Sequence, residues 1–539
     1  MQQFGPMAPP LMAQWLGSAL AAVLVLTALP CAAQVPTGTA QVHLVDVLHE
    51  TLRRNPAVLL QQQAVAFSTG ASVQARAPFD TVLSSELALG REAQPLRQDE
   101  IAAYDRAGLQ TAGRQTVDTL GLRVAAHKQL ADGSVASASL GVNQGDDNLL
   151  RLVRIPVQTT GRVDFSLRVP LLRNRGAEVV GAPLLAADAE QAAAQLDLVH
   201  ANARAVLDAT LAYWGCVASV QRLGIASDAE RRAAELLQEM GKLVQADQVP
   251  RSELELLHAG RADKTAARLA AEQSLQEALR DLARSMGLSV DQAAALPLPG
   301  DGFPPVDGAV AALAGRTADL AALALRTRAD LAAAGQRMAA ARHRVTASAD
   351  QLRPGLDLNL NLGYRTLVEG RGLTQLSAFV PTARQGLVAG VALQYQWPLD
   401  NSAARGQYLA QAAQRDAADL RWRDLQSAIG TDIATVAQRL VRAAAQRQQA
   451  QEAVQRYRIS LQNERTRHRL ARTTLIELLA VQDRLDNALL QEVQTQWAYA
   501  AGIATLQFET GQIVRQDGAQ FTVDAHRLLS VQSLGMAPS

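Results

Sequence analysis

The chain has 539 residues and a formal net charge of +1, so it can bury a large core and offers no overall basic field for nucleic acid. Aromatic residues make up only 4% of it, whereas alanine and glutamine are abundant, which suits long helices packed closely together. Its two cysteines, Cys31 and Cys216, are too few for a disulfide framework. These features exclude a basic nucleic-acid-binding protein and a disulfide-rich scaffold, and they favour a largely helical protein.

The N-terminus reads as an export signal. Residues 15–29, WLGSALAAVLVLTAL, form an apolar stretch too short to cross a bilayer comfortably. The sequence CAAQ that follows puts small residues at the −3 and −1 positions of a cleavage site, which predicts a signal peptide over residues 1–33. No Lys or Arg precedes the apolar stretch, so the true start of the chain stays open. Cys31 itself leaves open a lipid-anchored N-terminus. We expect an exported mature chain with no membrane-spanning helix.

Three segments of the first half recur in the second half in the same order. The first of each pair is a helix that runs into a strand, the second is an alternating strand that ends at proline and opens a helix, and the third begins a returning helix. The pairs are 55–80 with 328–354, 163–176 with 391–406, and 252–263 with 474–485. Each half therefore reads as helix, strands, very long helix and returning helix.

The repeat sets the expected boundaries of the chain. The first structural repeat is expected over 34–287 and the second over 317–511. Between them lies a linker over 288–316, which contains the proline- and glycine-rich sequence LPLPGDGFPPVDG. Residues 512–539 are left as a C-terminal tail.

The long helices have little core of their own. No proline interrupts the chain between Pro183 and Pro250 or between Pro398 and Pro538, and residues 402–470 alone would extend roughly 100 Å as a helix. Apolar residues recur there at spacings of three and four, which is the stripe of a helix packed against neighbours. We therefore expect these helices to pack laterally against copies of the chain or against a partner.

Three strands alternate sharply between apolar and polar residues, and each is about nine to eleven residues long, the length that a tilted strand needs to cross a bilayer. A soluble sandwich with one wet face shows the same alternation, but it does not need long helices directly after its strands. We therefore expect the apolar side chains to face lipid, in a barrel shared between chains because open edges are not tolerated there. The expected lipid-facing residues are Val163, Phe165, Leu167, Leu356, Leu358, Leu360, Val391 and Leu393.

From about Val45 to Gly511 the sequence resembles the TolC-type outer-membrane channel proteins of efflux pumps and type I secretion systems. The resemblance rests on the duplicated plan, on the strand ends VPLLRNRG and WPLDNSAARGQ, and on TLIELLAVQDRL. It implies a mainly helical fold with membrane β-structure: a trimeric outer-membrane β-barrel continuous with a long periplasmic helical barrel. It also implies a non-enzymatic export duct in the cell outer membrane, whose partners are itself as a homotrimer, outer-membrane lipid, a periplasmic adaptor and an inner-membrane efflux or ABC transporter.

The sequence departs from that family in its strands and at its helix turns. Residues 116–144 insert what reads as a hairpin turning at 131–133, so the barrel has four strands per chain if the hairpin stands outside the membrane and six if it joins the wall. At the turn before the second returning helix, Ala471 stands where the family usually has glycine. The turns over 246–252 and 470–475, with Ser252, Ala471 and Thr474, are where we expect the adaptor to dock.

In relatives, two aspartates three residues apart ring the closed periplasmic mouth. The resemblance puts Glu477 at the first of these positions and Ala480 at the second, so a ring of three Glu477 carboxylates would attract cations. Arg472 and Arg467 would supply bonds that hold the mouth shut, and Glu255 matches Glu477 in the first repeat. Ordinary solvated helix charges are the alternative interpretation.

Sites for chemistry are not indicated. The eight histidines lack metal-ligand spacing, and no phosphate loop, nucleophile elbow or Cys-x-x-Cys sequence occurs, so we expect no enzyme, cofactor or metal site. Cys216 is expected to be a small buried residue of a helix. The remaining functional alternative is a soluble periplasmic coiled-coil scaffold or adaptor.

Overall fold

The computed structural model describes residues 41–246, 250–370, 384–470, 472–518 and 520–531. The expected signal peptide with Cys31, and Ala471 at the second turn, lie outside the described residues. Gln41 to Ser539 belong to one compact unit of helices and a β-sheet.

Both halves of this unit follow the same plan. In the first half, α2 (Pro56–Arg76) leads into the sheet, and α6 (Ala182–Gln245) leaves it and is followed by the returning α7 (Ser252–Ser285). The second half repeats this with α10 (Ala329–Asp350), α11 (Ser402–Arg469) and α12 (Leu475–Glu509). The matched helices have 21 and 22, 64 and 68, and 34 and 35 residues. The predicted long helix over 402–470 is therefore confirmed.

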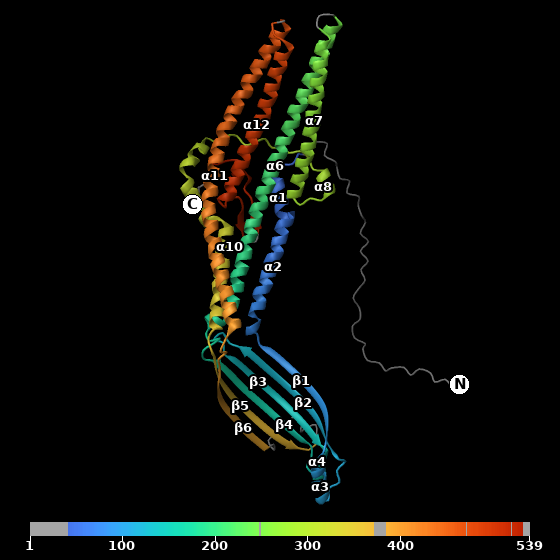
Figure 1. Ribbon diagram of the computed structural model, residues 1–539, viewed down its shortest axis with the longest axis vertical. Coiled ribbons are helices and arrows are strands. Elements are labelled where there is room, and N and C mark those ends of the chain that lie inside the picture. Colours follow the sequence, from blue (N-terminus) through green and yellow to red (C-terminus); the bar gives the residue numbers. More distant parts are fainter. Residues whose placement is uncertain (1–40, 247–249, 371–383, 471, 519, 532–539) are drawn as a thin grey trace, which may run out of the picture. The chain divides into compact units, whose positions relative to one another are not determined.

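Four helices lie side by side at each level along the long helices (Figure 1). Near the sheet, their order from contact to contact is α2, α6, α10 and α11, and toward the turns it is α7, α6, α12 and α11. At roughly 1.5 Å per residue, α6 and α11 are each about 100 Å long, so they run through both levels. One edge of the helical layer is therefore formed by α2 and α7, and the other by α11.

The largest core lies where the shorter helices meet along α6 and α12. Tyr213 and Trp214 are fully buried there, as is Cys216, which confirms its expected place. Tyr499 is fully buried in a second core, which α9, α11 and α12 share. Ile429, Ile433 and Leu440 of the predicted stripe are also fully buried. The elements that cover these two cores are α1 (Leu44–Arg54), α8 (Val290–Ala294), η2 (Gly308–Gly315), α9 (Thr317–Thr327), β7 (Arg515–Asp517), β8 (Gln520–Thr522) and η4 (Ala525–Leu528).

In the described part of the chain, no single helix has both the length and the apolar character to cross a membrane. The pair η2 and α9 passes that test only together, and it is bent by 84° at its junction.

The strands form one antiparallel six-stranded sheet in sequence order. They are β1 (Val82–Pro95), β2 (Arg114–Gln129), β3 (Val135–Asp147), β4 (Gln158–Pro170), β5 (Gly355–Glu369) and β6 (Arg384–Gln396). The predicted inserted hairpin is present as β2 and β3, and it pairs with β1 on one side and β4 on the other. The sheet therefore has six strands, of which β1 and β6 are the free edges.

Short helices sit at the ends of the strands. At the end away from the long helices, α3 (Gln98–Arg106) lies between β1 and β2, and α4 (Asn148–Leu152) lies between β3 and β4 (Figure 1). At the other end, η1 (Ala77–Phe79) joins α2 to β1, and α5 (Ala177–Val180) precedes α6. The sequence did not predict α3 or α4.

Over the middle of the sheet, the register separates apolar from polar side chains. Phe165 lies opposite Leu362, and Leu360 opposite Val391, so these side chains share a face. All eight residues expected to face lipid lie on this face. They are Val163, Phe165, Leu167, Leu356, Leu358, Leu360, Val391 and Leu393.

Candidate functional site

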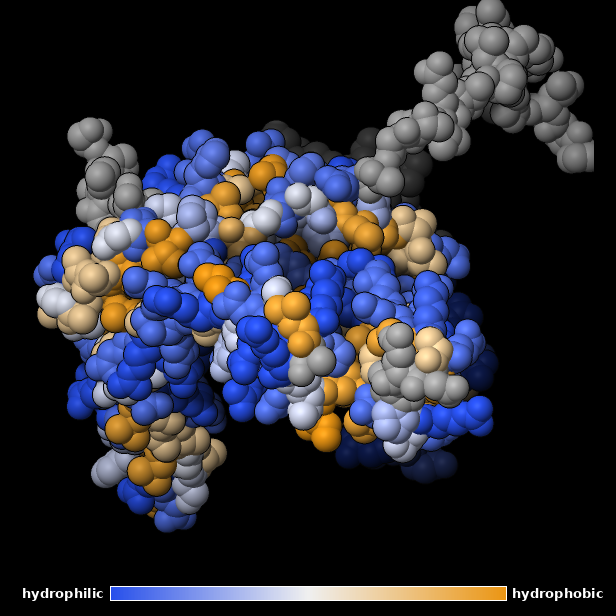
Figure 2. All heavy atoms as spheres, turned by 90° about the horizontal axis from the view of Figure 1, so that it is seen from above, coloured by the Kyte–Doolittle hydropathy of each residue, from blue (hydrophilic) through white to orange (hydrophobic). Residues whose placement is uncertain are grey.

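The turns at the far ends of the long helices hold the residues predicted for the mouth and for adaptor docking. One turn joins α6 to α7 and the other joins α11 to α12, and the two turns stand apart (Figure 1). Viewed from above these turns, most of the surface is hydrophilic, with hydrophobic residues gathered in patches (Figure 2). Leu470 and Ile476 at the second turn are 59% and 69% exposed, and Leu256 just beyond the first is 46% exposed. Exposed aliphatic side chains therefore flank both turns.

Glu477 lies in the first turn of α12, where it forms a capping box with Thr474. The Thr474 backbone N–H donates to Glu477 Oε2 at 3.1 Å, and the Glu477 backbone N–H donates to Thr474 Oγ1 at 3.3 Å. The Thr473 hydroxyl lies within hydrogen-bonding distance of the Glu477 and Glu464 carboxylates. The bond from Thr473, with that from the Thr474 backbone, holds the pKa of Glu477 below its usual value, so the exposed side chain stays ionised.

The first repeat does not reproduce this cap. Ser252 aligns with Thr474 in the repeat, but it is the first residue of α7, and the N-cap residue Arg251 makes no side-chain capping bond. Glu255 is exposed in the first turn of α7, and Glu253 is half-buried. The two turns are thus similar in acidic charge and different in how their helices begin.

Arg472 and Arg467, the arginines predicted to hold the mouth shut, make different contacts. Arg472 is exposed, and its backbone N–H donates to the Arg467 carbonyl at 2.9 Å. The Arg467 side chain lies 3.5 Å from Glu464 of its own helix, which is an i,i+3 pair on a largely exposed arginine. Within the described residues, this turn brings Arg472 and Glu477 to the same end of the helix pair and joins them by no ion pair.

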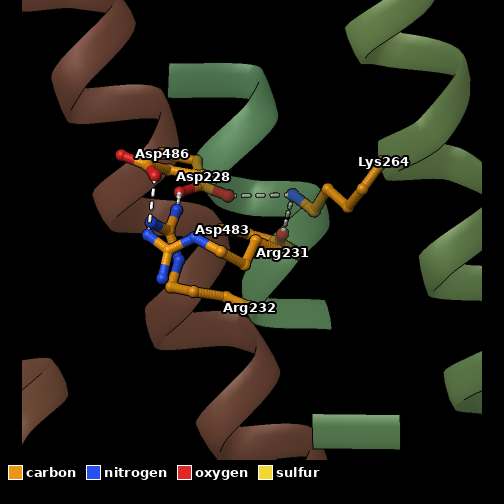
Figure 3. Close-up of polar contacts among 6 residues, drawn as sticks. All are labelled: Asp228, Arg231, Arg232, Lys264, Asp483 and Asp486. Carbon is orange, nitrogen blue, oxygen red and sulfur yellow. Dashed lines mark hydrogen bonds and ion pairs between the residues drawn. The ribbon is translucent and has the colours of Figure 1, made fainter. Parts of the chain in front are cut away.

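A network of charged residues farther from the turns joins the two repeats (Figure 3). Asp486 of α12 accepts from Arg232 of α6 at 2.5 Å and from Lys264 of α7 at 3.0 Å, through its two carboxylate oxygens. Lys264 also donates to Asp483 at 2.8 Å. The Arg232 and Asp486 side chains are only 17% and 10% exposed, so this ion pair is largely withdrawn from water. One carboxylate therefore ties α12 to both helices of the other pair.

The carboxylates of this network stabilise the charged form of Lys264. Burial lowers the pKa of Lys264, but its hydrogen bonds to Asp483 and Asp486 outweigh burial and hold that pKa above its usual value. The ammonium group is therefore retained at neutral pH. Closer to the middle of the helices, Arg222 of α6 donates to Gln494 of α12 at 2.5 Å and adds a second polar link between the same helices.

Sequence reasoning did not identify this network. Its local signal was present, because Asp483 and Asp486 are aspartates three residues apart on the returning helix, six residues beyond the aligned positions 477 and 480. Their partners Arg232 and Lys264 lie more than 200 residues away, and no local pattern predicts that pairing. The structure therefore assigns this aspartate pair to intrachain ion pairs.

The second candidate surface is the polar face of the sheet. Glu86 lies opposite Arg123, and Ser139 lies opposite Asp164, across adjacent strands. This face is hollowed, and the charged residues that line the hollow are Glu86, Arg123, Arg162, Asp164, Arg365 and Arg384. A charged, hollowed face and an apolar face on the same sheet are what a wall between an aqueous lumen and lipid requires.

Metal ligation is not indicated in the described ranges, which hold no group of three or more His, Cys, Asp or Glu side chains placed to bind a metal ion.

Comparison with known proteins identifies the fold. The sequence matches no protein-family model and no curated protein. The structure is similar to the outer-membrane channel OprN, with a TM-score of 0.62 and 16% identity over 87% of this chain and 90% of OprN. It is also similar to the CmeC outer-membrane channel of Campylobacter jejuni, with a TM-score of 0.62 and 12% identity over 87% and 85% of the two chains. The outer-membrane protein VceC of Vibrio cholerae matches with a TM-score of 0.62 and 18% identity over 87% and 96%. The chain therefore has the fold of bacterial outer-membrane channels, as the sequence resemblance predicted.

Proposed function

We propose that the protein is the outer-membrane channel of a tripartite efflux or type I secretion system. Three copies would form a passive duct that docks to a periplasmic adaptor and, through it, to an inner-membrane efflux or ABC transporter. The observation that carries the proposal is the combination in one chain of a sheet with one apolar face and helices of about 100 Å. In a soluble coiled-coil scaffold, the apolar sheet face that the described chain leaves uncovered would be exposed to water, which is unfavourable.

The β-sheet and the helical layer have their unpaired edges on the same two sides of the chain. This supports an assembly in which further copies cover those edges and complete a ring. At one side, α2 runs into the edge strand β1, and at the other side the edge strand β6 runs into α11. An interface between these two unlike sides is head-to-tail, and such an interface generates a ring when three equal rotations return to the first copy. Each copy would then supply a sector of both the β-barrel and the helical tunnel.

Exposed apolar residues on the two edges of the helical layer lie at similar distances from the sheet. Phe67 and Leu60 of α2 are 81% and 71% exposed, and Leu409 and Leu420 of α11 are 66% and 65% exposed. Measured along each helix from its end nearest the sheet, Phe67 and Leu409 lie at about 14 and 11 Å, and Leu60 and Leu420 at about 24 and 27 Å. Packing of α11 against α2 of the next copy would bury all four side chains.

At the mouth, Glu477 is proposed as the residue that charges the aperture, with Glu255 and Arg472 nearby. Its ionised, exposed carboxylate at the helix end supports that role. The turns that carry Ser252, Ala471 and Thr474 are proposed as the adaptor-docking surface, and the exposed Leu256, Leu470 and Ile476 beside them would give an adaptor apolar contacts. The ion pairs of Asp486 would hold the two helix pairs of each copy together in the closed state.

Expression in a Gram-negative host, followed by fractionation, tests the proposal. We expect the mature protein in the outer-membrane fraction, migrating faster without heating than after heating, with a mass of three chains after extraction in detergent. Ion conduction by the purified protein in planar bilayers is the functional readout. Recovery as a soluble periplasmic protein with no conduction would contradict the proposal and favour a coiled-coil scaffold.

A further inference from the structure

We propose that the inserted hairpin β2–β3 is part of the membrane wall, and that three copies close a barrel of eighteen strands in which β6 of each copy pairs with β1 of the next. This inference rests on the proposed function, because it takes the trimer and the outer membrane from it. The sequence alone left open whether the chain contributes four strands or six to the barrel.

The hairpin runs the full height of the sheet. Its two strands have 16 and 13 residues, comparable with the other four, which have 13 to 15. They pair continuously with β1 on one side and β4 on the other. A hairpin standing outside a membrane would leave these flanking strands without their hydrogen-bond partners inside the lipid, where unsatisfied backbone groups are not tolerated. Membership of the wall follows from the pairing.

The hairpin turn is fixed at the helix end of the sheet. The Gly176 backbone N–H, just before α5, donates to the Asp132 carbonyl at 2.9 Å. Gly133 has φ of +94°, and a Cβ there would lie 2.1 Å from the Asn174 carbonyl, so only glycine fits this close contact. The opposite ends of β1, β2, β3 and β4 carry the longer connections with α3 and α4. Short turns on one side and longer loops on the other are the arrangement of outer-membrane barrels.

The apolar face continues across the hairpin. Leu87 of β1 lies opposite Leu122 of β2, which lies opposite Val142 of β3. Leu140 of β3 lies opposite Val163 of β4, one of the residues expected from sequence to face lipid. On the other face Arg123 lies opposite Glu86, which continues the polar lining. Over the middle of the sheet, the hairpin thus carries the same two faces, in the same orientation, as the strands on each side of it.

The two edge strands suit each other as partners. Every residue of β1 and of β6 is exposed, so both edges are uncovered in a single chain. Because the sheet has six strands that alternate in direction, β6 of one copy and β1 of the next are antiparallel in a ring, and the alternation is preserved. A second copy of the chain can therefore occupy the edge without any rearrangement of the sheet.

The strand and helix layers also match in width. Strands about 4.8 Å apart and tilted by about 40° occupy about 6.3 Å of perimeter each, so six of them cover about 38 Å. Four helices at about 9 Å spacing cover about 36 Å. Eighteen strands give a barrel about 36 Å across between backbones, against about 24 Å for twelve. The hairpin would therefore widen the outer part of the duct by about half.

Site-directed fluorescence in lipid vesicles tests whether the β2–β3 hairpin lies in the membrane wall or outside the membrane. Single cysteines would replace Leu122 or Leu140 on the apolar face of the hairpin, and Ser139 on its polar face. A bimane label on each would be read in vesicles of brominated phosphatidylcholine. The native Cys216 is buried, and burial raises its pKa to about 11, so it does not compete for the label. Leu393→Cys on the apolar face of β6, outside the hairpin, is the reference.

We expect quenching of the label at positions 122 and 140 to equal that at 393, and the label at 139 to be unquenched. Quenching at 393 without quenching at 122 and 140 would overturn the inference and leave a channel with four strands per chain. No quenching at any position would instead contradict the proposed function itself.

Cysteine cross-linking tests the pairing of the edges. Ser85→Cys on β1 would be combined in turn with Ala389→Cys, Val391→Cys and Leu393→Cys on β6, which lie on the same face of the sheet. Side chains directly opposite each other on paired strands are close enough for a disulfide. We expect one combination to yield covalent dimers and trimers on oxidation. Failure of every combination in trimers that conduct normally would overturn the β6–β1 pairing.

Discussion

Asp486 of α12 and Arg232 of α6 form an ion pair of 2.5 Å that joins the two repeats, and Asp486 holds Lys264 of α7 with its other oxygen. Replacing Asp486 with Ala would leave Arg232 and Lys264 without this partner in a largely buried position. Removing one partner of a buried ion pair costs about 3 kcal/mol or more. We therefore expect Asp486→Ala to lower the unfolding midpoint, and to raise the basal conductance of purified trimers in planar bilayers.

A matched control is available on α6, the helix that carries Arg232. Asp228 and Arg231 of α6 form an exposed i,i+3 pair at 2.7 Å, and such pairs contribute little to stability because water screens their charges. Asp228→Ala should leave both readouts near wild type. A double-mutant cycle of Arg232→Ala with Asp486→Ala should show coupling, and additive effects would mean that the ion pair does not hold the helix pairs together.

Glu477 has two separable roles, as a helix cap and as a charge at the mouth. Glu477→Gln keeps a side chain that completes a capping box but removes the charge from all three copies of a trimer. Three carboxylates gathered at one aperture attract cations, and the amides that replace them do not. We therefore expect cation block and cation selectivity to fall in planar bilayers, while the unfolding midpoint stays near wild type.

The cap is tested by Thr474→Ala, which keeps the charge and removes the capping hydroxyl. We expect a loss of about 1 kcal/mol in stability, with cation block retained. Glu253→Ala should change block little, because this half-buried side chain belongs to the other helix pair. If Glu253→Ala abolishes block and Glu477→Gln does not, the charged ring belongs to the first repeat.

The apolar face of the sheet predicts which substitutions prevent membrane insertion. Leu358 and Leu393 lie opposite each other on this face, and Asn359 and Gln394 lie on the other. Arginine at Leu358 or Leu393 should cost about 2–4 kcal/mol near the bilayer midplane and reduce the amount of trimer in the outer membrane. Arginine at Asn359 or Gln394 should be tolerated and change only conductance. Equal amounts of all four variants in the outer membrane would contradict the assignment of the faces.

The sequence predicted those features of the fold that are encoded locally. The long α11 followed from a stretch without proline, and the faces of β4, β5 and β6 followed from strict alternation, since each depends on neighbours in the chain. The place of the β2–β3 hairpin did not follow, because pairing of β2 with β1 and of β3 with β4 depends on contacts that alternation does not encode. The capping box of Thr474 and Glu477 did have a local signal, T-x-x-E, but the resemblance drew attention to the charge instead. The partners of Asp486 are distant in sequence, and only the fold reveals them.

Asp301 anchors the N-terminal segment to α6 through hydrogen bonds that depend on pH. Asp301 accepts hydrogen bonds from the Tyr213 hydroxyl at 2.6 Å, from the Leu44 backbone N–H at 2.8 Å and from the His43 ring at 2.8 Å. Burial raises the pKa of Asp301, but these bonds outweigh it and hold that pKa below the usual 3.8. The bond to Asp301 in turn raises the pKa of His43 above 6.5.

The two groups act at opposite ends of the pH range. A lowered carboxyl pKa adds stability that is present above about pH 4 and is lost as pH falls through the folded pKa, so Asp301→Asn should flatten the acid side of the stability profile. A raised histidine pKa adds stability that is present below about pH 6.5 and is lost as pH rises through the folded pKa, so His43→Gln should flatten the neutral side. Unfolding midpoints of the trimer from about pH 3 to about pH 9 measure both effects. His49→Gln, a change on the adjacent helix α1, is the control and should leave the profile of wild type. If the Asp301→Asn profile falls on the acid side as steeply as wild type, the anchor does not carry this pH dependence.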